Sequence, residues 1–371
     1  MIPESAIQTQ VAVTMLPRFN SRLYLPLFEQ CGGIEGFFKE SPAALEKLYR
    51  ATHIPLRSPD RSLALEKAKR ELEDMDKHGI HICSIEHPGY PELLAHCEDA
   101  PLVFFYKGTL DINACPVRLA IVGTRHATPR GEAKVESILT ELSRSGHRPA
   151  IVSGLAFGID AAAHRASLSN HLKTYAVLGH GLHMIYPAAH KKLAEKIIET
   201  GGALISEFPC CAKVLPANFL QRNRIIAGMS QATLIAESAE KGGAMTTARI
   251  ALSYNRDVMA FPGRPEDKWS AGCNRLIKEN VAALVESTTD IANILGLSCS
   301  SALPLQTTLG LFSTDDNETV VLKLLSDKEN MRMDEIAVAT HIPVNELSAL
   351  FLKLELEGKV IALPGKNYSV C

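Results

Sequence analysis

The sequence predicts an α/β protein built around a central Rossmann-like, doubly wound, mostly parallel sheet. From residue 118 onward, apolar runs of strand length alternate with helical patterns, and several of the runs are followed by glycine-containing turns. Regular alternation of this kind implies parallel strands with helices on both faces of the sheet. The chain has 371 residues, of which 46% are hydrophobic and 22% are charged. This length and composition predict two or three packed domains.

Two segments precede the predicted sheet. Short helical patterns over residues 11–48 and a charged amphipathic helix over 62–77 predict an N-terminal helical domain over residues 1–80. Residues 81–117 contain a stretch rich in Pro and Gly and the apolar run 102–106. We interpret residues 81–117 as an extended connector that leads into the central domain.

The central domain is predicted over residues 118–296. Its strands are expected at residues 119–122, 150–152, 174–178, 203–205, 233–236, 258–261 and 282–285. Its helices are expected near residues 131–145, 159–169, 190–200, 218–229, 244–254 and 273–279. Open sheets of this kind bind ligands at the carboxyl ends of their strands, so the loops that follow these strands form the candidate site.

The C-terminal part predicts a linker and a small domain. Residues 297–311 are rich in Ser, Thr and Leu without periodicity, which is typical of a linker. Residues 312–371 show three helical patterns and then two strands about a Pro364-Gly365 turn, which is the order of a winged helix. Its second and third predicted helices favour protein docking over duplex DNA, because their charged residues are Asp334, Glu335, Glu346, Glu355 and Glu357 against Lys353.

Charge is distributed unevenly along the chain, whose formal net charge is −2. Residues 1–115 contain 12 basic and 16 acidic residues, residues 116–296 contain 21 and 15, and residues 311–371 contain 6 and 10. The central segment is therefore basic and the two flanks are acidic. This asymmetry favours an anionic partner at the centre.

Cysteine usage and hydropathy narrow the class of protein. The nine cysteines form no pair of C-x-x-C motifs, and the adjacent Cys210-Cys211 is unlike a zinc site, so no metal is expected. The N-terminus lacks a basic signal region, and no stretch approaches the roughly 18 apolar residues of a membrane span. We expect a cytoplasmic protein with reduced thiols and no membrane association.

The turn at residues 153–164 is the first candidate for anion binding. Ser153, Gly154 and Gly158 lie between an apolar strand and a helix, where backbone N–H groups approach an anion closely because no Cβ blocks the way. In the alternative interpretation, the glycines only let the chain turn and the helix pack on the sheet. The turn alone leaves both interpretations open.

Gly123-Thr124-Arg125 follows the first strand of the central domain. Neither G-x-G-x-x-G nor G-K-[ST] is present here, which argues against a dinucleotide cofactor and against ATP hydrolysis. An arginine in this place suits bidentate contact with a phosphate. A surface salt bridge is the alternative role for Arg125.

The helix expected at residues 218–229 contains polar groups beside its apolar stripe. Arg222 and Asn223 lie three or four positions before Ile225, Ile226 and Met229, so they either fix neighbouring loops or face a ligand. Phe219 is expected either to stack on a base or to lie in the core. Further glycine turns follow at Gly242-Gly243, near Thr246, at Gly263, and before Asn274, and together these loops predict an anion site.

An ordered set of motifs over roughly residues 118–286 resembles the DNA-processing protein A (DprA/Smf) family. The set includes G-T-R, S-G-L-A-x-G-I-D-A-A-A-H, V-L-G-x-G-L, G-A-L-I-S-E-F-P, N-F-x-x-R-N-R-I-I-A-G-M-S, G-G-A-M-T-T-A, R-D-V-x-A-F-P-G and G-C-N-R-L-I. The flanks resemble the family's SAM-like helical domain and its C-terminal winged helix.

The resemblance implies a non-enzymatic protein of natural transformation. Such a protein binds incoming single-stranded DNA, protects it, helps to load RecA recombinase on it, and forms a homodimer through the central domain, without a cofactor. With the loops above, it predicts a site for DNA phosphates made of Gly123, Thr124, Arg125, Ser153, Gly154, Gly158, Gly179, Phe219, Arg222, Asn223, Arg224, Gly242, Gly243, Thr246, Gly263 and Asn274.

Three departures from the family pattern bear on this interpretation. Phe157 stands where the family usually has an arginine, and Gly242 stands where it usually has a serine. We expect the pocket to form with altered contacts. Residues 17–20 replace the glycine-bearing turn of DNA-gripping hairpin motifs, which argues against independent DNA binding by the front end.

Two other functions are consistent with a Rossmann-like domain. One is a nucleotide phosphoribohydrolase of the LOG group, for which Glu207, Glu237 and the Asp160/His164 pair are the candidate acid–base groups. The other is a nucleotide-sensing regulatory protein that uses the winged helix to bind a partner. The spacing of residues shows no nucleophile or metal cluster, so we expect no catalytic residue.

Overall fold

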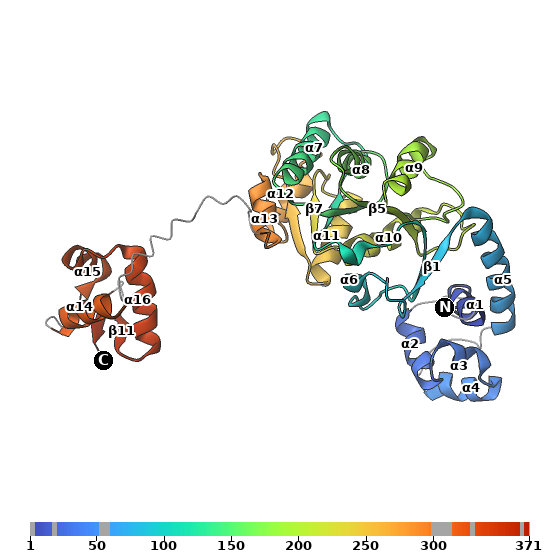
Figure 1. Cartoon of the computed structure of the whole chain (residues 1–371), viewed down its shortest axis with the longest axis horizontal. Helices are drawn as coiled ribbons and strands as arrows, with labels where there is room; N and C mark the ends of the chain where they lie inside the picture. Colours follow the sequence, from blue (N-terminus) through green and yellow to red (C-terminus); the bar gives the residue numbers. More distant parts are fainter. Residues whose placement is uncertain are drawn as a thin grey trace. The chain divides into compact units, whose positions relative to one another are not determined.

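The computed structural model describes residues 4–16, 21–51, 60–297, 314–326, 331–363 and 367–370, which form two compact units (Figure 1). The first unit spans residues 1–300 and the second spans 301–371. Three of the predicted features lie almost wholly outside the described residues: the linker 297–311, the segment 17–20 and the Pro364-Gly365 turn.

The first unit is built on a nine-stranded sheet in the order β1-β2-β6-β5-β4-β3-β7-β8-β9. Strands β3 to β9 are all parallel, which confirms the Rossmann-like, mostly parallel class. Their bounds are Arg118–Val122, Ala150–Ser153, Thr174–Val177, Ala203–Ser206, Ala232–Ile235, Asp257–Ala260 and Ala283–Leu284. Strands β3 to β7 are buried along their whole length, as expected for a parallel sheet covered on both faces.

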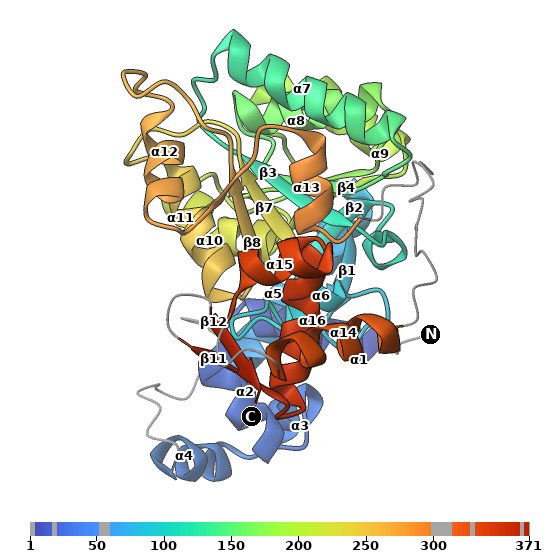
Figure 2. The ribbon, with the colours of Figure 1, turned by 90° about the vertical axis from the view of Figure 1, so that its left-hand side faces the viewer.

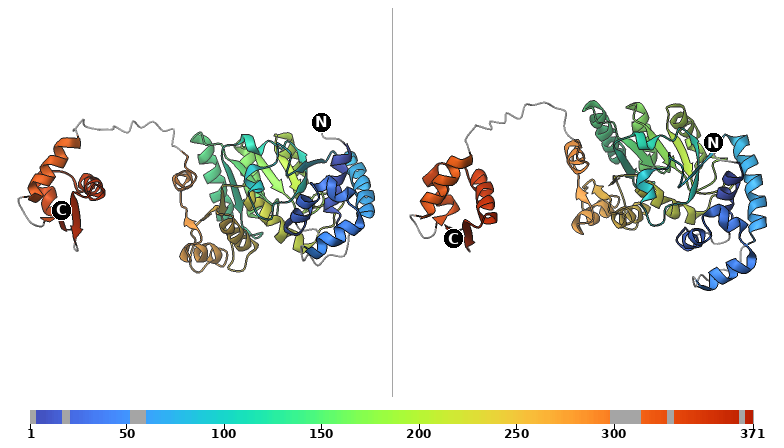
Figure 3. Two further views of the ribbon diagram at one scale, coloured as in Figure 1. Left: turned by 90° about the horizontal axis from the view of Figure 1, so that it is seen from below. Right: turned by 60° about the horizontal axis from the view of Figure 1, so that its bottom comes forward.

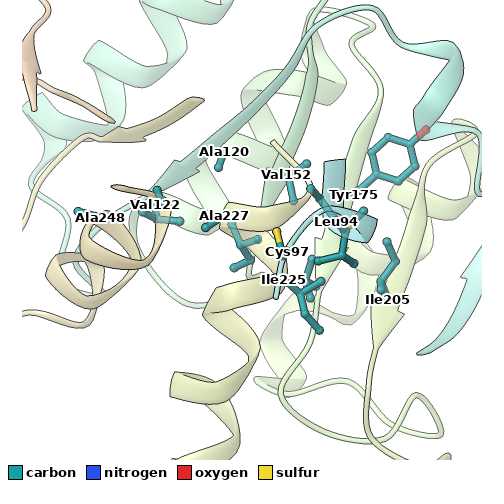
Figure 4. Packing of buried hydrophobic residues seen from close by; sticks show 14 of the residues in the cluster. Leu94, Cys97, Ala120, Val122, Val152, Tyr175, Ile205, Ile225, Ala227 and Ala248 are labelled. Carbon is teal, nitrogen blue, oxygen red and sulfur yellow. The ribbon is translucent and has the colours of Figure 1, made fainter. Parts of the chain in front are cut away.

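Helices pack on both faces of this sheet because alternate strand residues point to opposite sides (Figure 2). On β3, Leu119 and Ile121 pack with the first face's helices, which are α7 (Pro129–Arg144), α8 (Ile159–Ser169) and α13 (Thr288–Ile294). Ala120 and Val122 point the other way (Figure 4). They pack with α6 (Glu92–Ala95), α10 (Pro216–Gly228), α11 (Gly243–Ser253) and α12 (Ala271–Lys278).

The interpretation of residues 81–117 as a connector is wrong. Strands β1 (His81–Ser84) and β2 (Val103–Gly108) pair with each other antiparallel, and β2 pairs antiparallel with β6, so both extend the sheet. The apolar run is a strand because Phe104 and Phe105 are both buried, one in each of two different core clusters. The sheet therefore begins at residue 81, and the segment that follows β2 contains the short 3-10 helix η1 (Ile112–Ala114).

The N-terminal region is helical, as predicted, and it packs against the β1–β2 edge of the sheet (Figure 3). Tyr24, Phe28 and Phe37 form an edge-to-face aromatic cluster that belongs to the same core as Phe105 and Leu204 of the sheet. The helices are α1 (Glu4–Thr14), α2 (Ser21–Gln30), α3 (Ile34–Lys39), α4 (Pro42–Ala51) and α5 (Arg61–His78). Further along the chain of the first unit, between β5 and β6, helix α9 (Lys191–Glu199) packs on both of these strands.

The second unit is a winged helix, which confirms the predicted class of this domain. It consists of α14 (Thr314–Ser326), β10 (Met331–Arg332), α15 (Met333–Thr340), α16 (Val344–Leu356), β11 (Val360–Leu363) and β12 (Asn367–Val370). The sheet order is β10-β12-β11. The short strand β10, which was not predicted from the sequence, adds a third strand to the β11–β12 hairpin. Phe351 of α16 stacks on Tyr368 of β12, with ring centroids 3.9 Å apart, and joins the hairpin to the helices.

Replacing Gly108 by Ala tests whether β2 belongs to the sheet. Gly108 has φ 109°, and a Cβ there would overlap the carbonyl oxygen of Gly202 beside β6. We expect Gly108→Ala to lower the free energy of unfolding by about 3 kcal/mol, since strain and overlap add.

The matched control is Gly146→Ala, because Gly146 has φ 81° and open space around it. We expect it to cost about 1 kcal/mol in urea unfolding followed by circular dichroism. Equal losses in the two variants would contradict the close packing of β2 on β6.

Candidate functional site

The candidate site lies where the direction of strand succession reverses. Strands β3 to β6 follow one another toward one edge of the sheet, whereas β7 returns to the other side of β3. The connection after β3 leads to α7 on one face of the sheet and the connection after β7 leads to α11 on the other, and sheets of this kind bind ligands at such a point. A cleft of about 290 Å³ opens there. Of the predicted site residues, its walls contain Gly123, Thr124, Arg125, Phe219, Arg222, Asn223, Gly242 and Gly243.

The loops after β3 and β7 touch directly at Gly123. The backbone N–H of Thr124 donates to the carbonyl oxygen of Glu237 over 2.7 Å. A Cβ on Gly123 would lie 2.8 Å from that oxygen and 2.5 Å from Ile159 Cγ1. Glycine is therefore required here for close packing between the two loops and α8.

The turn after β4 lies mostly beneath the cleft. The buried Ser153 hydroxyl donates to the carbonyl oxygen of Ile121 over 2.6 Å. Gly158 has φ 75°, and a Cβ there would overlap the carbonyl oxygen of Thr124. These contacts support the packing interpretation of Ser153 and Gly158, while Ala156 and Asp160 from the same turn line the cleft.

Arg222 is a buried residue that fixes the loops around it. Only 3% of it is exposed, and its Nη1 donates to the carbonyl oxygens of Gly154, over 2.8 Å, and of Val177. Gly154 leaves room for this guanidinium, because a Cβ there would lie 2.5 Å from it. Burial lowers the pKa of Arg222 to about 10 against the opposing charge of Asp160, so the group stays protonated at neutral pH. Arg222 therefore fixes the neighbouring loops, and it also lines the cleft.

Arg125 is the exposed cation of the cleft. Its guanidinium lies over the ring of Phe219, 5.3 Å from the centroid, and it forms no salt bridge with any residue that the structure describes. Phe219 is half-buried at the rim and packs on Gly179, where a Cβ would lie 3.1 Å from its Cδ1. Arg125 thus keeps its N–H groups available, and Phe219 is not a core residue.

The N-terminus of α11 forms the wall opposite Phe219. Gly242 is its N-cap and supplies no side-chain cap; its carbonyl oxygen accepts from the N–H of Met245 over 3.1 Å, which leaves the N–H groups of Gly243 and Ala244 without a partner from that residue. These groups and the helix dipole favour an anion. Thr246 points away to solvent, and the next residue, Thr247, lines the cleft instead. A shift of one position turns a helical side chain by about 100°, which the sequence analysis did not resolve.

Arg224, Gly263 and Asn274 also lie outside the cleft. Arg224 lines a separate cavity of about 570 Å³, where it pairs with Glu207 and donates to the carbonyl oxygen of Asp99. The Asn274 side chain donates to the carbonyl oxygen of Gly263 over 2.9 Å and accepts from its N–H over 3.0 Å. The structure does not bring these three residues together with Arg125 in the cleft, and their part in binding stays a prediction.

The candidate acid–base groups of a hydrolase do not converge. Both carboxylate oxygens of Glu237 accept hydrogen bonds from Thr128, over 2.8 Å and 2.5 Å, which places Glu237 at the start of α7. Glu207 lies in the other cavity with Arg224. His164 is fully buried, its Nδ1 lies 2.7 Å from Thr174 Oγ1, and desolvation lowers its pKa to about 3. Within the described ranges, no three His, Cys, Asp or Glu side chains come together to hold a metal ion.

Sequence reasoning missed three aromatic groups at this site. His126 and Trp269 line the cleft and lie ring against ring, with centroids 5.4 Å apart. Tyr186 lies 5.9 Å from Phe219. The signal for Trp269 was that the only tryptophan of the chain occurs in a polar loop.

No helix among the described residues is both long and apolar enough to cross a membrane.

The chain is similar to known proteins over both units. The model of the family described as DNA recombination-mediator protein A matches residues 81–296, and that of the DprA winged helix domain matches residues 306–366. Protein Smf of Synechocystis sp. is 34% identical over 334 residues, covering 80% of this chain and 82% of that protein. DNA processing protein DprA of Streptococcus pneumoniae is 41% identical over 202 residues, covering 54% and 70%.

Two solved structures are similar as well. The X-ray structure of DNA processing protein A from Streptococcus pneumoniae superposes with a TM-score of 0.63 at 31% identity, over 78% of this chain and 96% of that one. The DNA processing protein A of Helicobacter pylori, solved for its single-stranded DNA binding mode, superposes with a TM-score of 0.52 at 26% identity. That match covers 59% of this chain and 97% of the other.

Alanine variants of Arg222 and Arg125 test whether Arg222 fixes the loops while Arg125 contributes little to stability. Arg222→Ala leaves Asp160 buried beside two carbonyl groups that lack their donor, so we expect a loss of about 3 to 5 kcal/mol in urea unfolding. Arg125→Ala removes an exposed side chain, and we expect a change within about 0.5 kcal/mol. Similar small losses in both would show that Arg222 does not support the loops.

His164 makes stability depend on pH. Its pKa falls from 6.5 to about 3 on folding, so the unfolded chain binds the extra proton and stability is lost as the pH falls below about 6.5. We expect the advantage of the natural protein over His164→Gln to shrink by about 2 kcal/mol between pH 7 and pH 5. Urea unfolding at the two pH values measures it, and an unchanged difference would contradict a neutral, buried His164.

Proposed function

Because this chain belongs to the DNA recombination-mediator protein A family, we propose that it binds single-stranded DNA in the cleft around Arg125 and catalyses no reaction. The observation that carries the proposal is the exposed guanidinium of Arg125 stacked on Phe219 at the carboxyl edge of the sheet. A cation and an aromatic ring side by side match the two repeating parts of a nucleotide, the phosphate and the base.

The cleft offers a phosphate two kinds of donor. The N–H groups of Arg125 form charge-assisted hydrogen bonds, and a fork of such donors suits phosphate oxygens. Across the cleft, the first turn of α11 presents backbone N–H groups at Gly243, where no side chain stands in the way. A phosphate between these two walls is therefore bound without a metal or a cofactor.

The aromatic rim favours single strands over duplexes. A base reaches the ring of Phe219 only if it is not paired and stacked inside a duplex. Stacking of this kind tolerates every base, because each base has a π-face, so the proposed binding is independent of sequence. The basic balance of residues 116–296 adds long-range attraction for the strand.

The biological role belongs to the same proposal. We infer that the protein acts in the cytoplasm, binds and protects DNA taken up in natural transformation, and helps to load RecA recombinase on it. A homodimer through the central domain is supported by the outer edge of β9, which pairs only with β8 among the described strands and exposes Leu284.

The winged helix is proposed to dock a protein rather than DNA. Its Lys353 and Lys359 both pair with Glu318, over 2.8 Å and 2.6 Å, and Lys359 also pairs with Glu357 over 2.8 Å. Two of its few cations are thereby neutralised within the domain. A protein partner fits this surface better than a phosphate backbone does.

Fluorescence anisotropy with a labelled single strand tests the proposal. We expect tighter binding to the single strand than to its duplex, and a logarithm of the binding constant that falls with the logarithm of salt by about 0.7 per neutralised phosphate. Arg125→Ala should lower affinity roughly tenfold and make the salt slope shallower by about 0.7.

The matched control is Arg144→Ala. Arg144 is an exposed arginine at the last turn of α7. It lies toward the amino ends of the strands, whereas the cleft lies at their carboxyl ends. It should bind DNA as the natural protein does. A response that does not change with salt would overturn the proposal, and equal losses in the two variants would move the site away from Arg125.

A further inference from the structure

Two more aromatic side chains lie exposed on the loops beside the cleft. Phe157, in the turn between β4 and α8, is 49% exposed, and Tyr186, in the segment between β5 and the 3-10 helix η2 (Ala188–His190), is 45% exposed. The neighbour of Phe157 along the chain, Ala156, lines the cleft itself. Neither ring is among the residues that line the cleft.

Phe157 stands on a fixed support. Its ring meets the ring of His190 edge to face, with centroids 4.9 Å apart, and His190 is buried. The Nδ1 of His190 lies 2.8 Å from the carbonyl oxygen of Leu155, a buried residue whose φ of 57° is uncommon for a side chain other than glycine. The turn is therefore held from below by the loop that also contains Tyr186.

Tyr186 continues the row of rings from the cleft. Its ring lies 5.9 Å from Phe219, which in turn lies under the Arg125 guanidinium. His190, the support of Phe157, follows Tyr186 by four residues on the same loop. Phe219 therefore neighbours both the Arg125 guanidinium and the ring of Tyr186, and Phe157 packs on the same loop that contains Tyr186.

The chemistry of this row points to unpaired bases. A surface that binds an apolar protein segment or a lipid does not require a cation at its end. Grooves that bind single-stranded nucleic acid combine cations, which contact the backbone, with aromatic rings, which stack on successive bases. The half-exposed rings leave area free to stack. Their neighbours in the row, Arg125 and Phe219, already offer a phosphate site and a first ring.

We propose that Phe157 and Tyr186 stack on further bases of the same single strand, so that the groove continues from Arg125 past Phe219 to the turn after β4. The proposal rests on the proposed binding of single-stranded DNA and deepens it. It assigns three rings to one strand and makes base stacking, rather than added charge, the contribution of Phe157 and Tyr186 to affinity.

Substitutions of Phe157 test whether the face of its aromatic ring stacks on a base. With a single strand of about 20 nucleotides, Phe157→Ala should weaken binding about fivefold or more, and Phe157→Trp should not. Phe157→Leu keeps apolar volume beside His190 but has no π-face, so it should bind as weakly as Phe157→Ala. The salt slope should stay that of the natural protein in all three, because no phosphate contact is lost.

A strand with the same sugar–phosphate backbone but without bases separates stacking from support of the loop. On this strand, the natural protein and Phe157→Ala should bind equally. If Phe157→Ala is weaker there too, or if Phe157→Leu binds as the natural protein does, the ring only shapes the turn and the inference is overturned. Tyr186→Leu should repeat the pattern of Phe157→Leu, with the loss confined to the strand that has bases.

The control for a general loss of apolar surface is Leu63→Ala on α5, which is 44% exposed and should not change binding. If the natural protein binds no single strand, the proposed function itself fails. If it binds with the expected salt slope and loses affinity in Arg125→Ala, but Phe157→Ala matches it on every strand, only the inference about Phe157 fails.

Discussion

The buried guanidinium of Arg222 is the interaction on which the rest of the site depends. It reaches from α10 to the carbonyl oxygens of Gly154 and Val177, at the ends of two neighbouring strands, and lies beside the carboxylate of Asp160. A charge at 3% exposure persists only with such partners, because its burial is otherwise very unfavourable. One side chain therefore joins a helix and two turns into a single support, and Gly154 provides the space for it.

This support determines which groups remain for a ligand. Phe219 precedes Arg222 by three residues on α10, so while Arg222 points inward, Phe219 lies at the start of the helix over Gly179 and under Arg125. The loops after β3 and β7 are joined by the Thr124–Glu237 hydrogen bond. Because the loops are fixed to one another, the proposed binding of a single strand requires little reordering of the protein, and the flexible strand would lose most of the conformational entropy.

Alternating apolar runs and glycine turns were sufficient to predict the parallel strands, the helices between them and the loops around Arg125. The predictions failed where the structure of a segment, or the direction of a side chain, depends on neighbours that are remote in sequence. The run 102–106 looks like a connector until β6 lies beside it. Arg222 and Arg224 are two positions apart, and only the helical rotation between them places one in the wall of the cleft and the other in the cavity with Glu207. Trp269 and Tyr186 reach the rim from loops whose course no local pattern specifies.

Arg125 of the first unit and the lysines of the winged helix differ in how their charges are satisfied, and this difference bears on the role proposed for each unit. In the first unit, Arg125 has its strongest described contact with a ring, not with a carboxylate, and so it remains able to attract phosphate. In the winged helix, Lys353 and Lys359 are paired with Glu318, while Val338 and Leu352 of α15 and α16 are 75% and 60% exposed. Long-range attraction for a polyanion thus arises from the central segment, since paired surface charges are screened at short range. A winged helix with neutralised lysines and exposed apolar side chains is instead suited to contact a protein.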